Sequence, residues 1–414
     1  MDDTNSLIEQ RKAKLASLRA KGIDPFQNKF TPSESCADAR ANYTEGRPVG
    51  VAGRITAHRD MGKSMFIDVK DQSGRLQAYA QKNVLGDEQF HIFQHLDLGD
   101  FIGVKGTLFT TRTGEISVKV ESFTILAKAL RPPPAKWHGL EDTEIRYRQR
   151  YLDLMANDDV KRVMLLRSRV IREIRNFLHA RGYVEVETPM MQAIPGGAAA
   201  QPFVTKHNAL GCDFYLRIAL ELYLKRLLVG GVDKVFEIGR NFRNEGLSRK
   251  HNPEFTMLEA YEAFGDYETM MDLVQGMVCH VAQEVLDTLV IEHKDAEGKV
   301  TKTINLTPPW QRVRYKDIVR DTVRAKTDGK VADWFALTPE ERRRVAIEDL
   351  KLAGDIGTQY EDFEVTGAVF EKLIEPTLIQ PTFVTHLPKQ LVPLAKISPD
   401  DPTTVEVFEC CING

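Results

Sequence analysis

The chain has few cysteines, little net charge and no long apolar run, and each absence excludes a class of protein. Its 414 residues include only five cysteines, an odd number without C-x-x-C spacing, which argues against a disulfide framework and favours reduced thiols. No apolar signal core opens the chain and no run reaches membrane-spanning length, so we expect a cytoplasmic protein with no membrane partner. Because the net charge is only −3, any nucleic-acid surface must be a local patch.

Residues 1–48 form a first segment, in which residues 5–22 have the pattern of a helix. Leu7, Leu15 and Leu18 fall roughly on one side, basic residues occupy much of the rest, and Gly22 ends the pattern. The basic residues fit a solvated helix face and an electrostatic contact with an RNA backbone about equally well.

From residue 49 to residue 129 the pattern changes to short alternating strands separated by Gly, Asp and Ser turns, which predicts a small β-barrel. Phe66, Gln77 and Glu115 have the opposite parity from the apolar core positions. A phenylalanine that faces outward suits base stacking, which contributes roughly 1–3 kcal/mol per base, although a single exposed phenylalanine is common in proteins without such a role.

A proline-rich break, Arg131-Pro-Pro-Pro134, predicts a linker over residues 130–144. A long helix with an apolar stripe follows, and it leads into a strand over 184–189; alone, this pattern indicates an ordinary helix on a sheet. The stripe contains Val163, Leu166, Val170, Ile174, Phe177 and Leu178. Residues 310–375 are charged and mostly helical in pattern, and we assign them no chemistry.

Two strand-like runs, residues 236–245 and 252–261, are joined by a short basic loop and predict an antiparallel hairpin. Side chains alternate along a strand, so one face of the hairpin is mostly apolar and the other is polar. From Phe255 to Tyr261 the polar row spans about 20 Å at ~3.3 Å per residue, long enough for a nucleotide and a small polar ligand. A sheet with one solvated face is the simpler explanation of such alternation.

The strings Phe-Arg-Asn-Glu-Gly at 242–246 and His-Asn-Pro-Glu-Phe-Thr at 251–256 resemble motif 2 of the class II aminoacyl-tRNA synthetases, especially the lysine-specific members. The helix and strand before residue 189 resemble motif 1, the homodimer interface of that family. The string from Gly53 to Tyr79 resembles the family's anticodon-binding domain. The resemblance implies an α+β protein, with an OB-fold barrel followed by a class II antiparallel sheet flanked by helices over residues 145–414, which includes the helical insertion 310–375.

The resemblance implies ATP-dependent ligation of L-lysine to tRNA(Lys) through a lysyl-adenylate. The attacking carboxylate is already ionised, so catalysis should consist of positioning and charge neutralisation. A guanidinium can fork onto two phosphate oxygens, and the family places the arginine that corresponds to Arg243 on the α-phosphate as the catalytic residue. The resemblance also assigns four further residues to ATP: Glu245, His251, Asn252 and Phe255, the last under adenine.

Selection of lysine requires buried anions that face an ε-ammonium group, because an unpaired buried charge is prohibitive. The resemblance assigns Glu259 and Tyr261 to this ammonium, Glu221 to the α-amino group, and Gly197 to a close approach of the backbone. Glu221 has another possible partner, because Lys225 lies four residues further along the same helix. Two residues depart from the family, Leu220 in place of a usual proline and His386 in place of a usual acid.

For the anticodon, the resemblance stacks Phe66 on the central base, lets Gln77 and Glu115 hydrogen-bond its edge, and places Arg59 nearby. It also favours RNA as the partner of the basic N-terminal helix.

In the family, Mg²⁺ on ATP is held by two glutamates and a Gly-rich motif that follow the strand corresponding to Phe408–Gly414, and none of these is in the sequence. We therefore expect no metal ligands here, and expect this polypeptide to be inactive or marginally stable. The alternative hypotheses are an inactive tRNA-binding or regulatory form and, less favoured, an enzyme for aspartate or asparagine, whose side chains need a cationic pocket.

Overall fold

The structure is a computed structural model that describes residues 2–133, 140–246, 248 and 251–414, and it divides into two compact units, Met1–Val163 and Met164–Gly414. The end of the predicted linker break, Pro134, lies outside the described residues, as do Leu247, Arg249 and Lys250 of the hairpin loop. In the described part of the chain, no helix is long and apolar enough to cross a bilayer. All five cysteines lie in the described part, and each has a free thiol.

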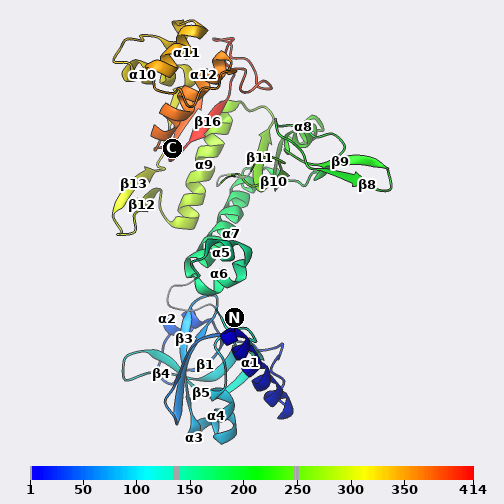
Figure 1. Ribbon diagram of the computed structural model, residues 1–414, viewed down its shortest axis with the longest axis vertical. Coiled ribbons are helices and arrows are strands. Elements are labelled where there is room, and N and C mark those ends of the chain that lie inside the picture. Colours follow the sequence, from blue (N-terminus) through cyan, green and yellow to red (C-terminus); the bar gives the residue numbers. More distant parts are fainter. Residues whose placement is uncertain (1, 134–139, 247, 249–250) are drawn as a thin grey trace. The chain divides into compact units, whose positions relative to one another are not determined.

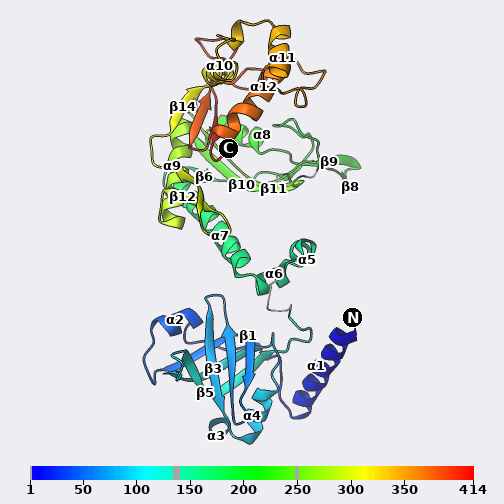
Figure 2. The ribbon, with the colours of Figure 1, turned by 60° about the vertical axis from the view of Figure 1, so that its left-hand side comes forward.

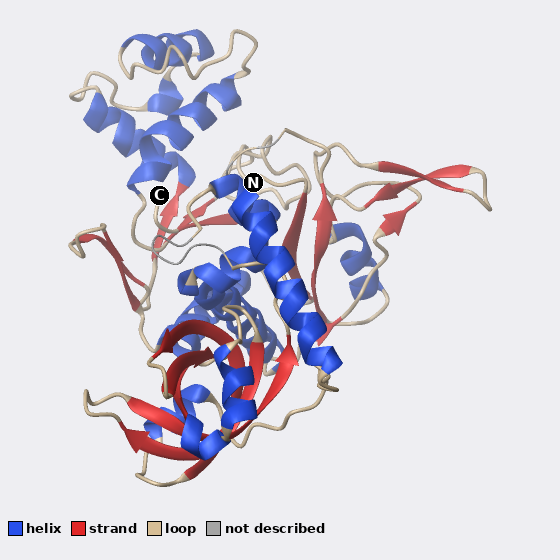
Figure 3. Cartoon of the chain, turned by 60° about the horizontal axis from the view of Figure 1, so that its bottom comes forward, coloured by secondary structure: helices blue, strands red, loops and turns tan. Residues whose placement is uncertain are grey.

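The first unit is built on a closed five-stranded barrel with the strand order β1-β2-β3-β5-β4, which confirms the predicted OB-fold (Figure 1). Neighbouring strands are antiparallel except for the parallel pair β3–β5. The strands are β1 (Pro48–Asp60), β2 (Ser64–Lys70), β3 (Arg75–Gln81), β4 (Phe101–Thr110) and β5 (Ile116–Ala127). Figure 3 shows these strands curving around a common interior.

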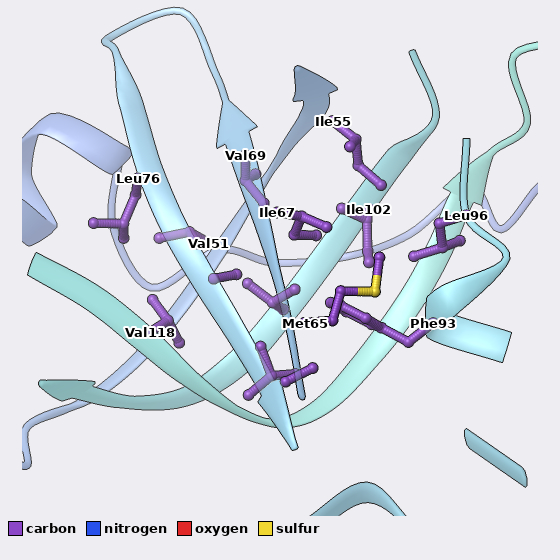
Figure 4. Packing of buried hydrophobic residues seen from close by; sticks show 14 of the residues in the cluster. Val51, Ile55, Met65, Ile67, Val69, Leu76, Phe93, Leu96, Ile102 and Val118 are labelled. Atoms are coloured by element: carbon purple, nitrogen blue, oxygen red, sulfur yellow. The ribbon is translucent and has the colours of Figure 1, made fainter. Parts of the chain in front are cut away.

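Alternate residues of the strands fill the barrel, as the period-two pattern predicted. The apolar residues of β2 and β3 at these positions are at most 1% exposed: Met65, Ile67, Val69, Leu76, Ala78 and Ala80. Figure 4 shows Met65, Ile67 and Ile102 in this core together with Phe93 of the short helix α4 (Asp87–Gln94), which follows α3 (Lys82–Leu85). The residues between these core positions therefore lie on the outer surface of the barrel.

The N-terminal helix α1 (Asp2–Ala20) packs against this barrel, with Leu18 on the core cluster while Leu7 stays exposed (Figure 2). Its basic residues are partly used inside the protein. Arg11 donates to the carbonyl oxygens of Ala129 at 2.7 Å and Arg131 at 3.1 Å, and Lys14 pairs with Asp97 at 2.6 Å. The charge on this helix is thus partly structural. The remaining helices of the unit are α2 (Cys36–Ala41), α5 (Thr143–Arg148) and α6 (Arg150–Ala156).

The second unit contains the predicted hairpin, β10 (Lys234–Phe242) and β11 (Glu254–Glu262), with β6 (Val184–Glu185) parallel to β10. The helices α7 (Asp158–His179) and α9 (Tyr267–Leu286) cover one face of this sheet. The strand predicted over 184–189 is shorter than expected, because the backbone N–H of Thr188 donates to the side chain of Glu237 instead of continuing the ladder.

A second three-stranded sheet has the order β14-β15-β16, and helices gather beside it (Figures 1 and 2). The strands are β14 (Gln311–Arg314), β15 (Thr382–Thr385) and β16 (Phe408–Cys411). The helices around it, with a core that includes Trp334 and Val369, are α10 (Tyr315–Lys326), η1 (Trp334–Ala336), α11 (Pro339–Glu348), α12 (Asp362–Val369), η2 (Phe370–Ile374) and η3 (Glu375–Thr377). The range 310–375 therefore contains the strand β14 near its start, and from Tyr315 onward it consists of helices joined by loops.

Three smaller elements complete the second unit. A sheet of order β7-β9-β8 is formed by β7 (Met191–Gln192), β8 (Val204–His207) and β9 (Cys212–Leu216), and it leads into α8 (Glu221–Val229). The strands β12 (Val290–Lys294) and β13 (Val300–Asn305) pair as a separate ribbon. The segment 217–221, which connects β9 to the first residue of α8, lies next to the hairpin and is central to the site.

Candidate functional site

The two faces of the hairpin differ as the alternation predicted. Phe236, Ile238 and Leu258 pack against Phe177 of α7 and Met277 of α9 in one apolar cluster. The ladder pairs Glu237 with Glu259, Gly239 with Met257, and Asn241 with Phe255, so these side chains share the opposite, polar face. The polar face therefore has an acidic end near Glu259 and an aromatic end near Phe255.

At the acidic end, which we call the ammonium end, Glu259 is held by two donors. The hydroxyl of Tyr261 donates to its Oε2 at 2.9 Å, and the backbone N–H of Leu220 donates to its Oε1 at 3.2 Å. Burial raises the pKa of Glu259 above its ordinary value, and the charges of Glu221 and Glu237 add to this effect; the two hydrogen bonds offset only part of it. This carboxylate lacks a cation among the described contacts, so a ligand ammonium would be strongly favoured here.

Glu221, the first residue of α8, lies beside Gly197 at the same end. A Cβ on Gly197 would come within 3.1 Å of the Ala219 Cβ and 3.2 Å of the Glu221 Cβ, and the φ of Gly197 is +89°. Both features require glycine. The Glu221 carboxylate pairs with Lys225 Nζ at 2.5 Å, so the alternative partner that the spacing offered is in contact with it.

At the other end, which we call the phosphate end, Arg243 and Phe255 lie together. The guanidinium carbon of Arg243 is 5.2 Å from the centroid of the Phe255 ring, and its Nε donates to the carbonyl oxygen of Ile218 at 3.4 Å. An aromatic ring and a permanent cation side by side suit a nucleotide, because one can stack on the base while the other meets a phosphate.

β10 ends at Phe242, so Arg243 and Glu245 lie just beyond the strand. The N–H of Arg243 still donates to the carbonyl oxygen of Pro253 at 2.9 Å, in register with the ladder, and the N–H of Asn244 donates to the carbonyl oxygen of Gln201 at 2.8 Å. Arg243 therefore keeps the side of the hairpin that it shares with Phe255, as the alternation predicted, whereas Glu245 lies in the exposed loop.

The three remaining residues assigned to ATP lie in the exposed hairpin loop. His251 Nδ1 is 2.8 Å from the hydroxyl of Ser248, and Asn252 donates to the carbonyl oxygen of Glu254 at 2.6 Å, while Glu245 is exposed. Among the described contacts, none joins these three side chains to Arg243. The structure thus brings together the residues of each end of the hairpin but not the loop residues.

The sequence reasoning missed a buried ion pair beneath the polar face. Arg217 and Glu237 are 2% and 3% exposed, and Arg217 Nη1 lies 2.6 Å from Glu237 Oε1. Two signals were present in the sequence. Glu237 has the parity of the polar face, and Gly239 interrupts a strand, which often marks the close approach of another group.

On the barrel, the four residues assigned to the anticodon lie on one outer surface. The ladder pairs Arg59 with Phe66, and Phe66 with Tyr79, whose ring stacks on Phe66 at a centroid distance of 4.5 Å. The adjacent pair is Asp68 with Gln77. Phe66 is half-buried and Gln77 is buried, so packing against neighbouring residues fixes the orientation of both side chains.

Charged groups surround this outer surface as a chain of ion pairs. Asp68 contacts Arg59 at 3.0 Å and Arg75 at 2.8 Å, and Glu115 contacts Arg75 at 3.2 Å and Arg40 at 3.1 Å. The hydroxyl of Ser117 donates to Gln77 Oε1 at 2.9 Å, which directs the amide nitrogen of Gln77 away from Ser117. The surface offers a ring for stacking, an amide donor and several cations.

In the part of the chain that the structure describes, no group of three or more His, Cys, Asp or Glu side chains is placed to hold a metal ion. Glu237 and Glu259 lie toward the ammonium end, whereas a metal on a nucleotide would be needed near Arg243, where Glu245 and Glu254 are exposed and belong to no such group. The residues that the structure describes near Arg243 therefore do not fit a magnesium site.

Each of the two units matches a known protein family. A family described as "tRNA synthetases class II (D, K and N)" matches residues 142–414, which is more than half of the chain. A family described as "OB-fold nucleic acid binding domain" matches residues 49–126, the region of the barrel.

Individual relatives agree with these matches. The lysine–tRNA ligase of Pelotomaculum thermopropionicum is 49% identical over all of this chain and 79% of its own length. The lysine–tRNA ligases of Moorella thermoacetica and Bacillus subtilis are 47% and 44% identical, and in each case the match covers all of this chain and 82% of the relative. The chain is thus similar to these ligases along both units.

Proposed function

Since this chain belongs to the class II aminoacyl-tRNA synthetases and is related along its whole length to lysine–tRNA ligases, we propose that the polar face of β10 and β11 is where it forms lysyl-adenylate. The protein ligates lysine to tRNA for translation and uses ATP as a substrate. The observation that carries the proposed site is the acidic end of the hairpin, where Glu259 is half-buried and its described hydrogen bonds come only from neutral donors.

In this proposal, the ammonium end selects lysine. Glu259 binds the ε-ammonium group, with Tyr261 holding the carboxylate in place, and Glu221 binds the α-amino group beside the open backbone at Gly197. Aspartate and asparagine would need a cation at this end. The nearest buried cation, Arg217, is already neutralised by Glu237, so the pocket repels an acidic side chain.

The phosphate end carries out the chemistry by charge neutralisation. The lysine carboxylate attacks the α-phosphorus of ATP, pyrophosphate leaves, and negative charge on the α-phosphate is met by Arg243. Phe255 stacks on adenine, and Glu245, His251 and Asn252 of the loop contact the nucleotide. No general base is needed, because the attacking carboxylate is ionised at neutral pH. In the second step a hydroxyl of the tRNA terminus attacks the activated carbonyl carbon and AMP leaves.

We propose that Mg²⁺ arrives with ATP, since a triphosphate at neutral pH normally binds this ion. The described residues of the hairpin do not hold it, and no step is assigned to it.

The barrel is proposed to read the anticodon of tRNA(Lys). Phe66 offers its ring to a base, and the amide nitrogen of Gln77 points away from Ser117 toward a base edge. Arg59 and Glu115 flank this surface, although both already take part in ion pairs, so we assign them contacts at its border.

We also propose that the protein is a homodimer through the motif 1 region. Large apolar side chains of α7 and of the segment that follows it are exposed in the single chain. They include Met164, Leu165, Val184, Met190, Met191 and Ile194, the last 81% exposed. A patch of this kind indicates a protein interface. A cytoplasmic location is proposed as well, because ribosomes consume the product and unpaired thiols suit a reducing compartment.

Amino-acid-dependent exchange of pyrophosphate with ATP tests the proposed function. Although the sequence alone led us to expect an inactive polypeptide, the relation to lysine–tRNA ligases predicts that the protein catalyses exchange with lysine, and none above background with aspartate or asparagine. Exchange supported by aspartate, or the absence of exchange with every amino acid, would contradict it.

A further inference from the structure

Arg217 connects three separate segments of the second unit. Its Nε donates to the carbonyl oxygen of Arg240 at 2.7 Å, and its Nη1 donates to Glu237 Oε1 at 2.6 Å and to Thr188 O at 3.0 Å. Its backbone N–H donates to Met190 O at 2.8 Å. One buried side chain therefore joins the segment after β6, the strand β10 and the segment that leads into α8.

The residues that follow Arg217 set the positions of the proposed ligand-binding groups. The carbonyl oxygen of Ile218 accepts from Arg243, the N–H of Leu220 donates to Glu259, and Glu221 is the next residue. The ammonium end and the phosphate end are thus both in contact with the segment 217–221. A shift of this segment would move both ends of the site together.

We propose that Arg217 is a positioning residue for lysine activation. It fixes the segment 217–221, and this segment holds Glu221, Glu259 and Arg243 at the relative positions that the reaction requires. This inference rests on the proposed function. Arg217 is 2% exposed and all of its described partners are protein groups, so it acts through the segment and not by touching a substrate.

Gly239 leaves the space that the guanidinium of Arg217 occupies. A Cβ at this position would lie 2.1 Å from Arg217 Nη2 and 3.1 Å from Glu237 Oε1. A single methyl group would therefore push the guanidinium away from its carboxylate without changing any residue proposed to touch lysine or ATP. The interior of β10 carries a glycine here because the guanidinium occupies the space of a side chain.

Two variants of the full-length protein test the role of Arg217. Arg217→Lys keeps the charge opposite Glu237 but loses the planar fork that reaches Arg240 and Thr188 together. Gly239→Ala leaves Arg217 intact and displaces it. The control is Arg342→Lys in α11, where the guanidinium bonds Asp362 at 2.8 Å within the helical insertion.

The measurement is pyrophosphate exchange with separate titrations of lysine and ATP, corrected for the concentration of active sites. Both test variants should show a raised KM for lysine and a lowered kcat, so that kcat/KM for lysine falls about 100-fold, the order expected for a displacement near 1 Å. The KM for ATP should change little, because the proposed contacts of Phe255 and of the hairpin loop with the nucleotide lie outside the segment, and the shift of Arg243 should lower kcat. Arg342→Lys should change none of the three parameters.

Several results would overturn the inference. If both variants only reduce the number of active sites and leave both KM values and kcat per site unchanged, Arg217 is merely structural. Failure of both variants to fold leads to the same conclusion. If the parent protein supports no lysine-dependent exchange, the proposed function fails, and the inference fails with it.

Discussion

Tyr261 donates its hydroxyl hydrogen to Glu259 Oε2 at 2.9 Å, two residues away on the same strand face. Burial raises the pKa of Tyr261, and the neighbouring Glu259 charge raises it further, so the phenol stays protonated and remains a donor. The tyrosine therefore holds one carboxylate oxygen while Leu220 holds the other, and a bound ammonium would meet a carboxylate that is already oriented.

The first prediction concerns this pair. Glu259→Gln removes the charge that faces the lysine ammonium, and loss of one partner from a desolvated charge pair costs about 2–5 kcal/mol, so the KM for lysine should rise by about 30-fold or more. Tyr261→Phe removes a neutral hydrogen bond of about 0.5–1.5 kcal/mol and should raise it up to about tenfold. Lysine titration of pyrophosphate exchange measures both KM values. Equal increases in the two variants would contradict a charge-pairing role for Glu259 and an orienting role for Tyr261.

The second prediction is a gain in stability from the same Glu259→Gln change. The pKa of Glu259 is raised in the folded protein, so its ionisation weakens the folded state as the pH rises through that pKa. Without lysine, the variant should thus unfold at a higher urea concentration than the parent at pH 7.5. The difference should vanish in acid below about pH 4, where the carboxyl is protonated in both states.

A control for this second prediction lies on the same strand. Burial would raise the pKa of Glu262, but hydrogen bonds from Lys234 and Tyr183 bring it below its ordinary value. Glu262→Gln should therefore destabilise the protein at neutral pH. Urea unfolding without ligand measures both variants, and loss of stability in both would show that the two carboxylates do not differ as their surroundings indicate.

The third prediction concerns Lys225, whose ammonium group is 2.5 Å from Glu221. In the proposed site, this ammonium competes with the α-amino group of lysine for one carboxylate. Because pairs of this kind at i,i+4 contribute only about 0.3–0.5 kcal/mol, Lys225→Met should lower the KM for lysine about twofold. Arg344→Met is a matched control, since Arg344 pairs with Glu348 at the same spacing in α11. A raised KM in Lys225→Met would mean that Lys225 orients Glu221.

Much of the fold followed from the sequence because alternation and motif strings are local. The core of the barrel and the apolar face of the hairpin were predicted from periodicity alone, and Met65 and Phe236 are buried as expected. The parts that were missed depend on contacts between distant segments. The backbone N–H of Asn244 donates to Gln201 in a separate segment, and the side chain of Arg217 bonds Thr188 and Arg240. No spacing rule connects such residues.

The structure supports the predicted site residues unequally. Gly197 and Glu221, predicted from the family resemblance, do lie together, whereas His251 and Asn252 lie in an exposed loop. Loop residues gain their positions from a ligand more often than residues on a sheet do. The assignments in the loop therefore stay predictions, and the ammonium end is the part of the site that the protein alone already organises.

The fourth prediction separates RNA recognition from lysine activation. Phe66→Leu keeps apolar volume but removes the ring, so tRNA(Lys) binding should weaken by about 1–3 kcal/mol, the usual contribution of one stacked base. Exchange with lysine and ATP should be unchanged, because that reaction needs no tRNA. Phe101→Leu is the control: Phe101 is an exposed phenylalanine on β4, 37% accessible, and the guanidinium carbon of Arg54 lies 4.2 Å from its ring centroid. Filter binding at fixed salt measures both variants, and equal losses would show that the Phe66 ring is not a stacking platform.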